Sequence, residues 1–278
     1  MTLKEETIQK INRFVNEKPR TIQEIAFLIK KNWRTADRYV EQISKEQGTI
    51  LTRTFREGTR GALKIVFWNN SESVYSTKFQ EKLLSRILSS KDKSDFSPFD
   101  IYQYIENTKR NAFLEKAKHE NIVKQDLGNL FRTAKQSILM FSGDLSWSNL
   151  KAANEKILDV IEEMAKTGTK INVLTNVDID SLENTEKFLS INNKLGKELI
   201  EVRHFEQPLR AFIIDDKIAR LKEVKDSKPR IKTFIFYEIY DKEWITWLSK
   251  VFWHMFQTAI PAERRIKDLR SIQELKIT

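Results

Sequence analysis

The sequence predicts a two-domain protein that combines the α+β and α/β classes. A small helical domain closed by a β-hairpin precedes a larger α/β domain with a mixed sheet. Within residues 1–70, apolar residues recur at helical spacing and then give way to two β-rich runs separated by glycines. From residue 137, apolar strand-like runs alternate with amphipathic helices and end in successive strands, an order typical of an α/β layer whose first strands are parallel.

The first three helices follow from spacing and capping signals. A helix over residues 3–16 precedes Thr21, which forms a capping box with Glu24 and so begins a second helix. A third helix over residues 33–46 turns Trp33 and the apolar residues at 36, 39, 40 and 43 inward. Its other face carries groups suited to base edges and phosphates. This predicted DNA-binding face consists of Arg34, Thr35, Arg38, Gln42 and Lys45.

Two β-rich runs, 49–55 and 62–68, follow the third helix and flank a glycine-containing turn. Three helices and a hairpin are the order of a winged helix, and residues 1–70 resemble that family. The resemblance implies a hairpin tip along the DNA backbone or minor groove, where Arg53, Arg56 and Arg60 would make contacts. The alternative is a solvated basic turn on a module that binds protein.

Net charge and composition indicate one kind of binding partner and exclude some kinds of site. The chain has 278 residues and a net charge of +10, and residues 1–70 hold fourteen Lys and Arg against eight Asp and Glu. Such an excess indicates a phosphate-binding surface, although the host's amino-acid usage is an alternative source. The chain has no Cys, which excludes disulfides and thiolate metal sites. No signal peptide or membrane span is predicted, so we expect a cytoplasmic protein.

Residues 71–136 are predicted to be a helical linker or dimerisation segment, with helices over 74–90, 98–107 and 120–136. Residues 137–260 form the predicted α/β domain, and residues 261–278 form a charged tail that either docks as a helix or stays loose. Within the α/β domain we expect strands over 137–143, 170–177, 200–205, 209–215, 218–224 and 231–240, and helices over 154–167, 181–195 and 241–259.

The run EVRHFEQPLRAFIIDDK at 201–217, with TAIPAERRI at 258–266, resembles the phospholipase D-like domain of TrmB-type archaeal transcription regulators. Enzymes of that superfamily carry His-x-Lys-x-x-x-x-Asp at this strand, where the His attacks phosphorus. Placing Asp215 on the motif Asp puts Arg210 at the Lys position and Pro208 at the His position. Proline has no side-chain nitrogen, so the resemblance implies a domain that has lost its nucleophile.

A pocket that has lost catalysis can still bind. Arg203, His204, Arg210 and Asp215 are candidates for holding a small anionic or sugar-like effector, because Arg pairs with phosphate or carboxylate in bidentate fashion. The alternative is an ion pair of Arg210 with Asp215 or Asp216, and a His204 that is merely a satisfied polar residue. The three His are not spaced as metal ligands, and no glycine-rich phosphate loop occurs, so we expect no metal or other cofactor.

The sequence is consistent with three functional hypotheses. The first is a DNA-binding transcription regulator that binds double-stranded DNA as a homodimer, with the inactive domain used for sensing or dimerisation. An aromatic stripe on the predicted helix at 241–259 is either core or a subunit contact. The second function is a nuclease or phosphodiesterase in which a displaced His204 is the nucleophile. The third is a protein-interaction adaptor that binds no nucleic acid.

Overall fold

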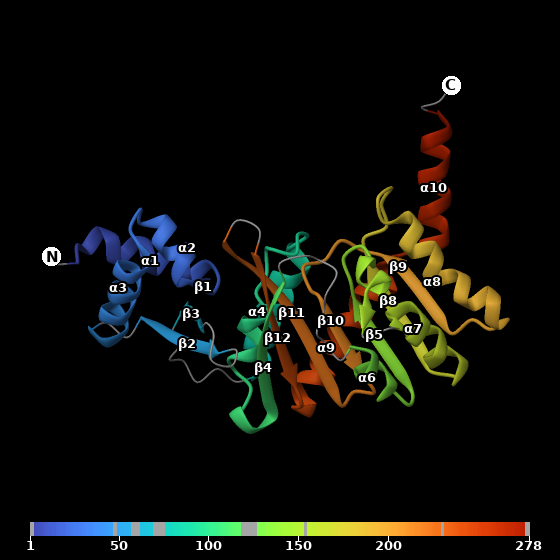
Figure 1. Ribbon diagram of the computed structural model, residues 1–278, viewed down its shortest axis with the longest axis horizontal. Coiled ribbons are helices and arrows are strands. Elements are labelled where there is room, and N and C mark those ends of the chain that lie inside the picture. Colours follow the sequence, from blue (N-terminus) through green and yellow to red (C-terminus); the bar gives the residue numbers. More distant parts are fainter. Residues whose placement is uncertain are drawn as a thin grey trace.

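The computed structural model describes residues 3–46, 49–56, 62–68, 76–117, 127–152, 155–228 and 231–275. A small amino-terminal domain lies at one end of an elongated molecule, and a larger α/β domain built around one sheet occupies the rest (Figure 1). The last helix extends away from the body of the larger domain. No helix within the described residues is both long and apolar enough to cross a bilayer.

The amino-terminal domain contains three helices and a small antiparallel sheet whose strand order is β1-β3-β2. The predicted capping box is confirmed: Thr21 Oγ1 accepts the Glu24 N–H at 3.2 Å, and Glu24 accepts the Thr21 N–H at 2.7 Å. Asn32 Oδ1 accepts the Thr35 N–H and so begins the third helix. In order, the elements are α1 (Glu5–Glu17), β1 (Arg20–Thr21), α2 (Ile22–Leu28), α3 (Trp33–Glu46), β2 (Ile50–Arg56) and β3 (Ala62–Trp68).

The sheet of the larger domain has eight strands among the described residues, in the order β13-β9-β8-β5-β10-β11-β12-β4. The first three strands predicted for the α/β domain, β5, β8 and β9, are parallel as expected, and the other pairs are antiparallel. The strands are β4 (Arg110–Ala117), β5 (Ser137–Phe141), β8 (Lys170–Thr175), β9 (Ile200–His204), β10 (Ala211–Ile214), β11 (Ile218–Lys228), β12 (Ile231–Ile239) and β13 (Ile260–Pro261).

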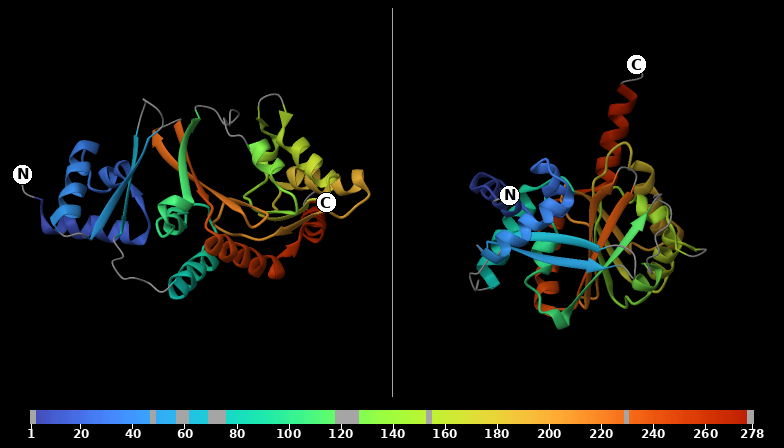
Figure 2. Two further views of the ribbon diagram at one scale, coloured as in Figure 1. Left: turned by 90° about the horizontal axis from the view of Figure 1, so that it is seen from below. Right: turned by 60° about the vertical axis from the view of Figure 1, so that its left-hand side comes forward.

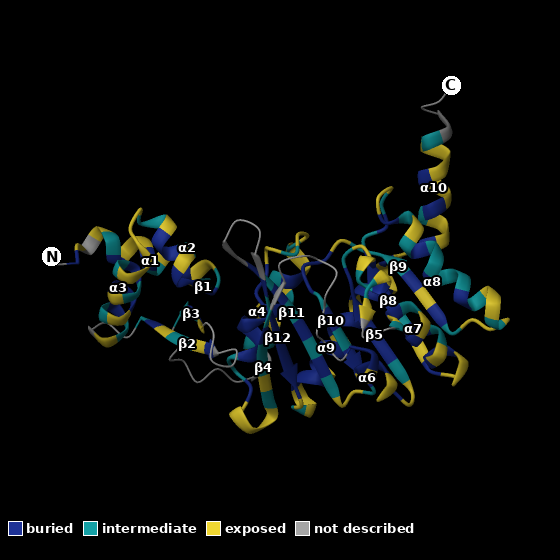
Figure 3. Ribbon diagram, in the orientation of Figure 1, coloured by how far each residue is buried: buried dark blue, intermediate teal, exposed yellow. Residues whose placement is uncertain are grey.

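Helices cover both faces of this sheet, and Figure 2 shows α9 on one face with α7 and α8 on the other. One buried cluster joins the sheet to α6 (Leu127–Arg132), α7 (Ile157–Lys166), α8 (Leu182–Leu195) and α10 (Ala262–Leu275). A second cluster joins it to α4 (Ser76–Ser89), α5 (Phe99–Tyr102) and α9 (Lys242–Thr258). The aromatic stripe of α9 belongs to this second cluster and is therefore core (Figure 3).

The hairpin of the amino-terminal domain also packs into that second cluster. Phe55 of β2 and the buried Leu63 and Ile65 of β3 belong to it, and Phe55 lies against Phe99 and Tyr237 with ring centroids 6.3 and 6.1 Å apart. One face of the hairpin is thus buried against the larger domain. The two domains share an apolar contact, and the small domain is not merely tethered to the large one.

The prediction of a purely helical segment over 71–136 is wrong at residues 110–117. These residues form β4, which pairs along its whole length with β12 at an edge of the large sheet. Phe113 stacks on Phe236 at 5.2 Å, and Leu114 is buried, so pairing with a strand more than a hundred residues later decides the conformation. Of the helix predicted over 120–136, residues 127–132 form α6, residues 133–136 do not continue the helix, and residues 120–126 lie outside the described residues. The tail predicted over 261–278 contains the helix α10.

Candidate functional site

The outward face of α3 carries a row of cationic side chains. Arg34, Arg38 and Lys45 are exposed and lie on successive turns, because spacings of four and seven residues return to one face of a helix. None of the three takes part in an ion pair within the described ranges. Trp33 is also on the surface, with 55% of its area exposed, so its predicted inward position is wrong.

Two acidic residues of α3 form ion pairs with one lysine of the neighbouring sheet. Lys64 of β3 places its ammonium 2.6 Å from Asp37 Oδ1 and 2.8 Å from Glu41 Oε1. Burial opposes the charge on Lys64, but the hydrogen bonds to both carboxylates outweigh it and raise the pKa of the ammonium. Asp37 and Glu41 are therefore paired with Lys64 and not with Arg34, Arg38 or Lys45, and the ammonium offsets one of their two negative charges.

Other residues of the predicted DNA-binding set have different positions. Thr35 and Gln42 are half-buried on α3, and Gln42 has a partner of its own. Arg53 of β2 turns towards the larger domain, where its guanidinium lies 3.4 Å from the Tyr102 hydroxyl and 5.2 Å from the centroid of that ring. Arg56 ends β2, and Arg60 lies outside the described residues.

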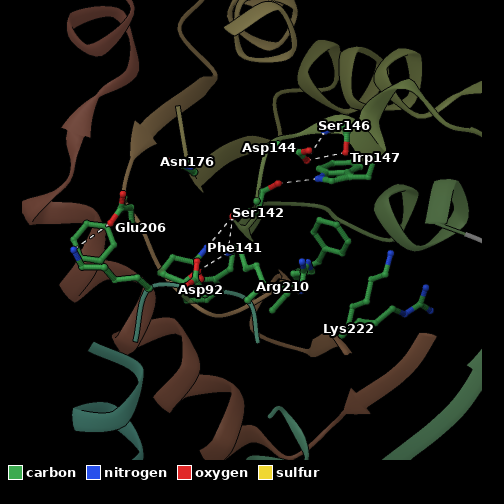
Figure 4. A pocket seen from close by; sticks show the side chains of 18 of the residues that line it. Asp92, Phe141, Ser142, Asp144, Ser146, Trp147, Asn176, Glu206, Arg210 and Lys222 are labelled. Atoms are coloured by element: carbon green, nitrogen blue, oxygen red, sulfur yellow. Dashed lines mark hydrogen bonds and ion pairs between the residues drawn. The ribbon is translucent and has the colours of Figure 1, made fainter. Parts of the chain in front are cut away.

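A cavity of about 500 Å³ opens at the carboxyl ends of the parallel strands, where α/β sheets commonly place ligands (Figure 4). Three turns form its walls, because β5, β8 and β9 all end at this edge. The start of β10, residues of α6, β11 and β12, and the segment 91–93 complete it. Its polar lining includes Lys91, Asp92, Lys93, Ser142, Asp144, Ser146, Asn176, Glu206, Gln207, Arg210, Arg220 and Lys222, and its aromatic lining is Phe141, Trp147, Phe205, Phe212 and Phe236.

Arg210 is the cationic group of this cavity that has no fixed partner. Within the part of the chain that the structure describes, its guanidinium makes no hydrogen bond or ion pair. Burial lowers the pKa of Arg210, and the negative charge of Asp144 partly offsets this. Asp144 itself is engaged by Ser146, which donates its N–H and its hydroxyl to Oδ1 at 3.0 and 2.7 Å. Arg210 is therefore available to a ligand carboxylate or phosphate.

Lys93 holds the rim of the cavity together. Its ammonium donates to the carbonyl oxygens of Ser142, Gln207 and Leu209 at 2.9, 2.6 and 2.7 Å. Burial, and then the nearby charge of Arg210, keep the pKa of Lys93 well below its ordinary value. Sequence reasoning missed Lys93, since its partners lie 49 to 116 residues away and no local pattern identifies them.

The structure separates the four residues that the sequence proposed as a ligand site, and only Arg210 lines the cavity. Asp215 lies at the opposite end of β10, roughly 17 Å away at the usual strand rise. Arg203 donates to Glu201 at 2.7 Å and to the Phe256 carbonyl at 2.9 Å. The alternative of an Arg210–Asp215 ion pair is wrong, because Asp215 instead accepts three backbone N–H groups.

His204 is a satisfied polar residue outside the cavity. Its Nδ1 accepts the Val177 N–H at 3.0 Å. Burial, and then the charge of Arg265, lower the pKa of His204. No His among the described residues lines the cavity, and Pro208 is buried beside it. His204, the nucleophile that the rival phosphodiesterase hypothesis requires, therefore does not line this cavity.

The described part of the chain is thus a mixed α/β protein with a basic helix face at one end and a cationic cavity at the sheet edge.

No family model and no curated protein sequence matches the chain. Solved structures similar to it include the following three, and these similarities do not assign it to a family. Nuc, a phospholipase D family member from Salmonella typhimurium, has 10% identity and a TM-score of 0.40 and covers 55% of this chain and 97% of its own. The archaeal chromatin protein TrmBL2, described as showing a novel mode of DNA binding, has 14% identity, a TM-score of 0.40 and coverages of 92% and 93%. Polyphosphate kinase from Porphyromonas gingivalis has 8% identity, a TM-score of 0.36 and coverages of 78% and 55%.

Proposed function

We propose that this protein is a DNA-binding transcription regulator whose amino-terminal domain is a winged helix. The observation that carries the proposal is the exposed row of Arg34, Arg38 and Lys45 on α3, beside two acids that are paired with Lys64. A helix face with three exposed cations fits the major groove of duplex DNA, where Arg pairs with phosphates and with guanine edges. The element order, from α1 through α3 to the β2–β3 hairpin, also fits a winged helix.

We propose further that the larger domain is a catalytically inactive, phospholipase D-like sensor. Arg210 stands where the enzymes of the resembling superfamily carry Lys, and Pro208 stands where they carry the nucleophilic His. An unpaired guanidinium in a cavity with aromatic walls supports binding of a small anionic effector. As a homodimer, the protein would place two α3 helices on successive major-groove faces of a near-palindromic site, about 34 Å apart.

The test of this proposal uses DNA fragments that the wild-type protein selects from its own genome. Fluorescence anisotropy then compares wild type with Arg34→Ala and Arg38→Ala over a series of salt concentrations. Each variant should weaken binding by about 1–3 kcal/mol if it loses a base contact. If it loses a phosphate contact, it should instead reduce the magnitude of the salt slope by about 0.9.

Arg264→Ala is the matched control, because it removes one exposed Arg from α10, at the other end of the molecule. This variant should bind as wild type does. Unchanged affinity in both α3 variants would refute the proposed interface. Absence of any DNA binding at low salt would favour the adaptor function, and hydrolysis of a chromogenic phosphodiester that His204→Ala abolishes would favour the phosphodiesterase.

A further inference from the structure

The segment 91–97 lies between the cavity and the amino-terminal domain. Its first three residues line the cavity, and Lys93 contacts the rim carbonyls. On the other side, Lys18, which directly follows α1, donates its ammonium to the Ser94 carbonyl at 2.6 Å. A second cavity, of about 270 Å³, is lined by residues of both domains and again includes Lys93. One short segment therefore contacts a ligand-sized space and the domain proposed to read DNA.

A buried charge cluster on β11 adds a second link at the same place. The ammonium of Lys225 lies 3.1 Å from Glu223 Oε1, 3.8 Å from Glu24 Oε2 and 3.4 Å from the Pro19 carbonyl oxygen. Both Lys225 and Glu223 are buried, and Ser97 donates its hydroxyl to Glu223 at 2.7 Å. The far end of the segment and the start of α2 thus share one ion cluster, whose charges are costly to leave unpaired.

Glu24 is the residue through which this cluster reaches the DNA-reading helix. It closes the capping box at the start of α2, and α2 packs directly on α3. A shift of the segment that alters the contacts of Lys18 and Lys225 must therefore move or loosen α2. Because packed cores transmit displacement and do not absorb it, α3 would follow.

We infer that the segment 91–97 is a coupling element: release of Lys93 from the rim carbonyls loosens the docking of the amino-terminal domain on the larger domain. This coupling would connect the cavity to α3 of the proposed regulator, and in that respect it rests on the proposed function. A ligand anion bound to Arg210 would offer Lys93 an acceptor stronger than neutral carbonyls and so favour its release. The coupling is thermodynamically reciprocal, so the docking of the small domain must also affect the segment.

Hydrogen exchange measured by mass spectrometry on the full chain tests the coupling without DNA or a ligand. Lys93→Met removes the ammonium from the rim while keeping a long side chain. Exchange in the peptides covering 18–28 should rise at least about fivefold, as expected when a local opening becomes easier. Lys91→Met is the matched control: among the described residues the exposed ammonium of Lys91 pairs with Glu206 at 3.4 Å and does not contact the rim carbonyls, so those peptides should stay unchanged.

A second variant tests the same coupling from the amino-terminal domain, so the test does not depend on the folding of the Lys93 variant. Lys18→Met breaks the contact from the other domain, 2.6 Å from Ser94, and should speed exchange of the peptides covering 91–97. Unchanged exchange at 18–28 in Lys93→Met, or at 91–97 in Lys18→Met, would overturn the coupling. The outcome is independent of DNA affinity, so a failure of the coupling and a failure of the proposed DNA binding are distinguishable.

Discussion

Replacement of Asp215 tests whether this carboxylate is a structural element or part of a ligand site. Its side chain is 2% exposed and accepts the N–H groups of Lys135, Gln136 and Ser137 at 2.8, 2.8 and 2.9 Å. Burial opposes its charge, but these hydrogen bonds prevail and lower the pKa of Asp215 below the ordinary 3.8. Its φ of 49° is left-handed, a conformation that Asp and Asn tolerate better than Ala.

These contacts give the expected cost of each substitution. Asp215→Ala loses three hydrogen bonds worth about 1 kcal/mol each where water can reach the donors, and adds about 1 kcal/mol of backbone strain. We therefore expect a loss of about 4 kcal/mol in the free energy of unfolding. Asp215→Asn keeps one oxygen and tolerates the backbone, so its cost should be about 1–2 kcal/mol. Asp216→Ala is the control, because Asp216 has φ 52° but accepts only one side-chain hydrogen bond, from Ser249.

Urea unfolding at pH 7, followed by circular dichroism, measures these differences. The difference between wild type and Asp215→Asn should persist above pH 3.8 and shrink below it. A depressed folded-state pKa stabilises the protein above the unfolded-state pKa, and that stabilisation is lost as the carboxylate is protonated. A loss in Asp215→Ala no larger than that in Asp216→Ala would refute the structural role of the three amide hydrogen bonds.

Two further predictions concern buried and paired charges. Burial raises the pKa of Asp100 to about 6 despite its pair with Arg86, so stability should fall by up to about 3 kcal/mol as pH rises from 4 to 6.5, where only the folded state keeps the proton. Urea unfolding of Asp100→Asn should lack this loss, and parallel pH profiles for the two proteins would contradict the assignment. Lys64→Met should weaken DNA binding about fivefold by anisotropy, because Asp37 and Glu41 then repel phosphates. Replacing those two acids with Asn and Gln should restore the affinity, and a triple variant that stays weak would instead place Lys64 itself on the DNA.

Local signals predicted the elements whose conformation depends on neighbouring residues. The Thr21–Glu24 capping box, the helix pair and the hairpin strands follow from contacts within a few residues. The parallel strands β5, β8 and β9 follow from strand–helix alternation, since a strand joined to the next by a helix must return in the same direction. Arg210, which the resemblance placed at the Lys position of the phospholipase D motif, lines the cavity.

Contacts between residues far apart in the sequence determined the features that local signals did not predict. β4 was missed because it is a strand only when β12 lies beside it. The fold does not bring the predicted ligand residues together, since strand direction places Arg210 and Asp215 at opposite ends of β10. Arg53 turned out to face Tyr102 of the larger domain, which no pattern in the hairpin encodes.

The sequence by itself determined the helices and strands that local signals set, the charged residues of α3 and the absence of a side-chain nitrogen at Pro208. It could not determine which charges remain free, because that depends on partners brought together by folding. Only the tertiary structure placed Lys64 against the acids of α3 and Lys93 against the rim of the cavity. The physical reason is that electrostatic effects depend on distance and burial in space, and separation along the chain sets neither.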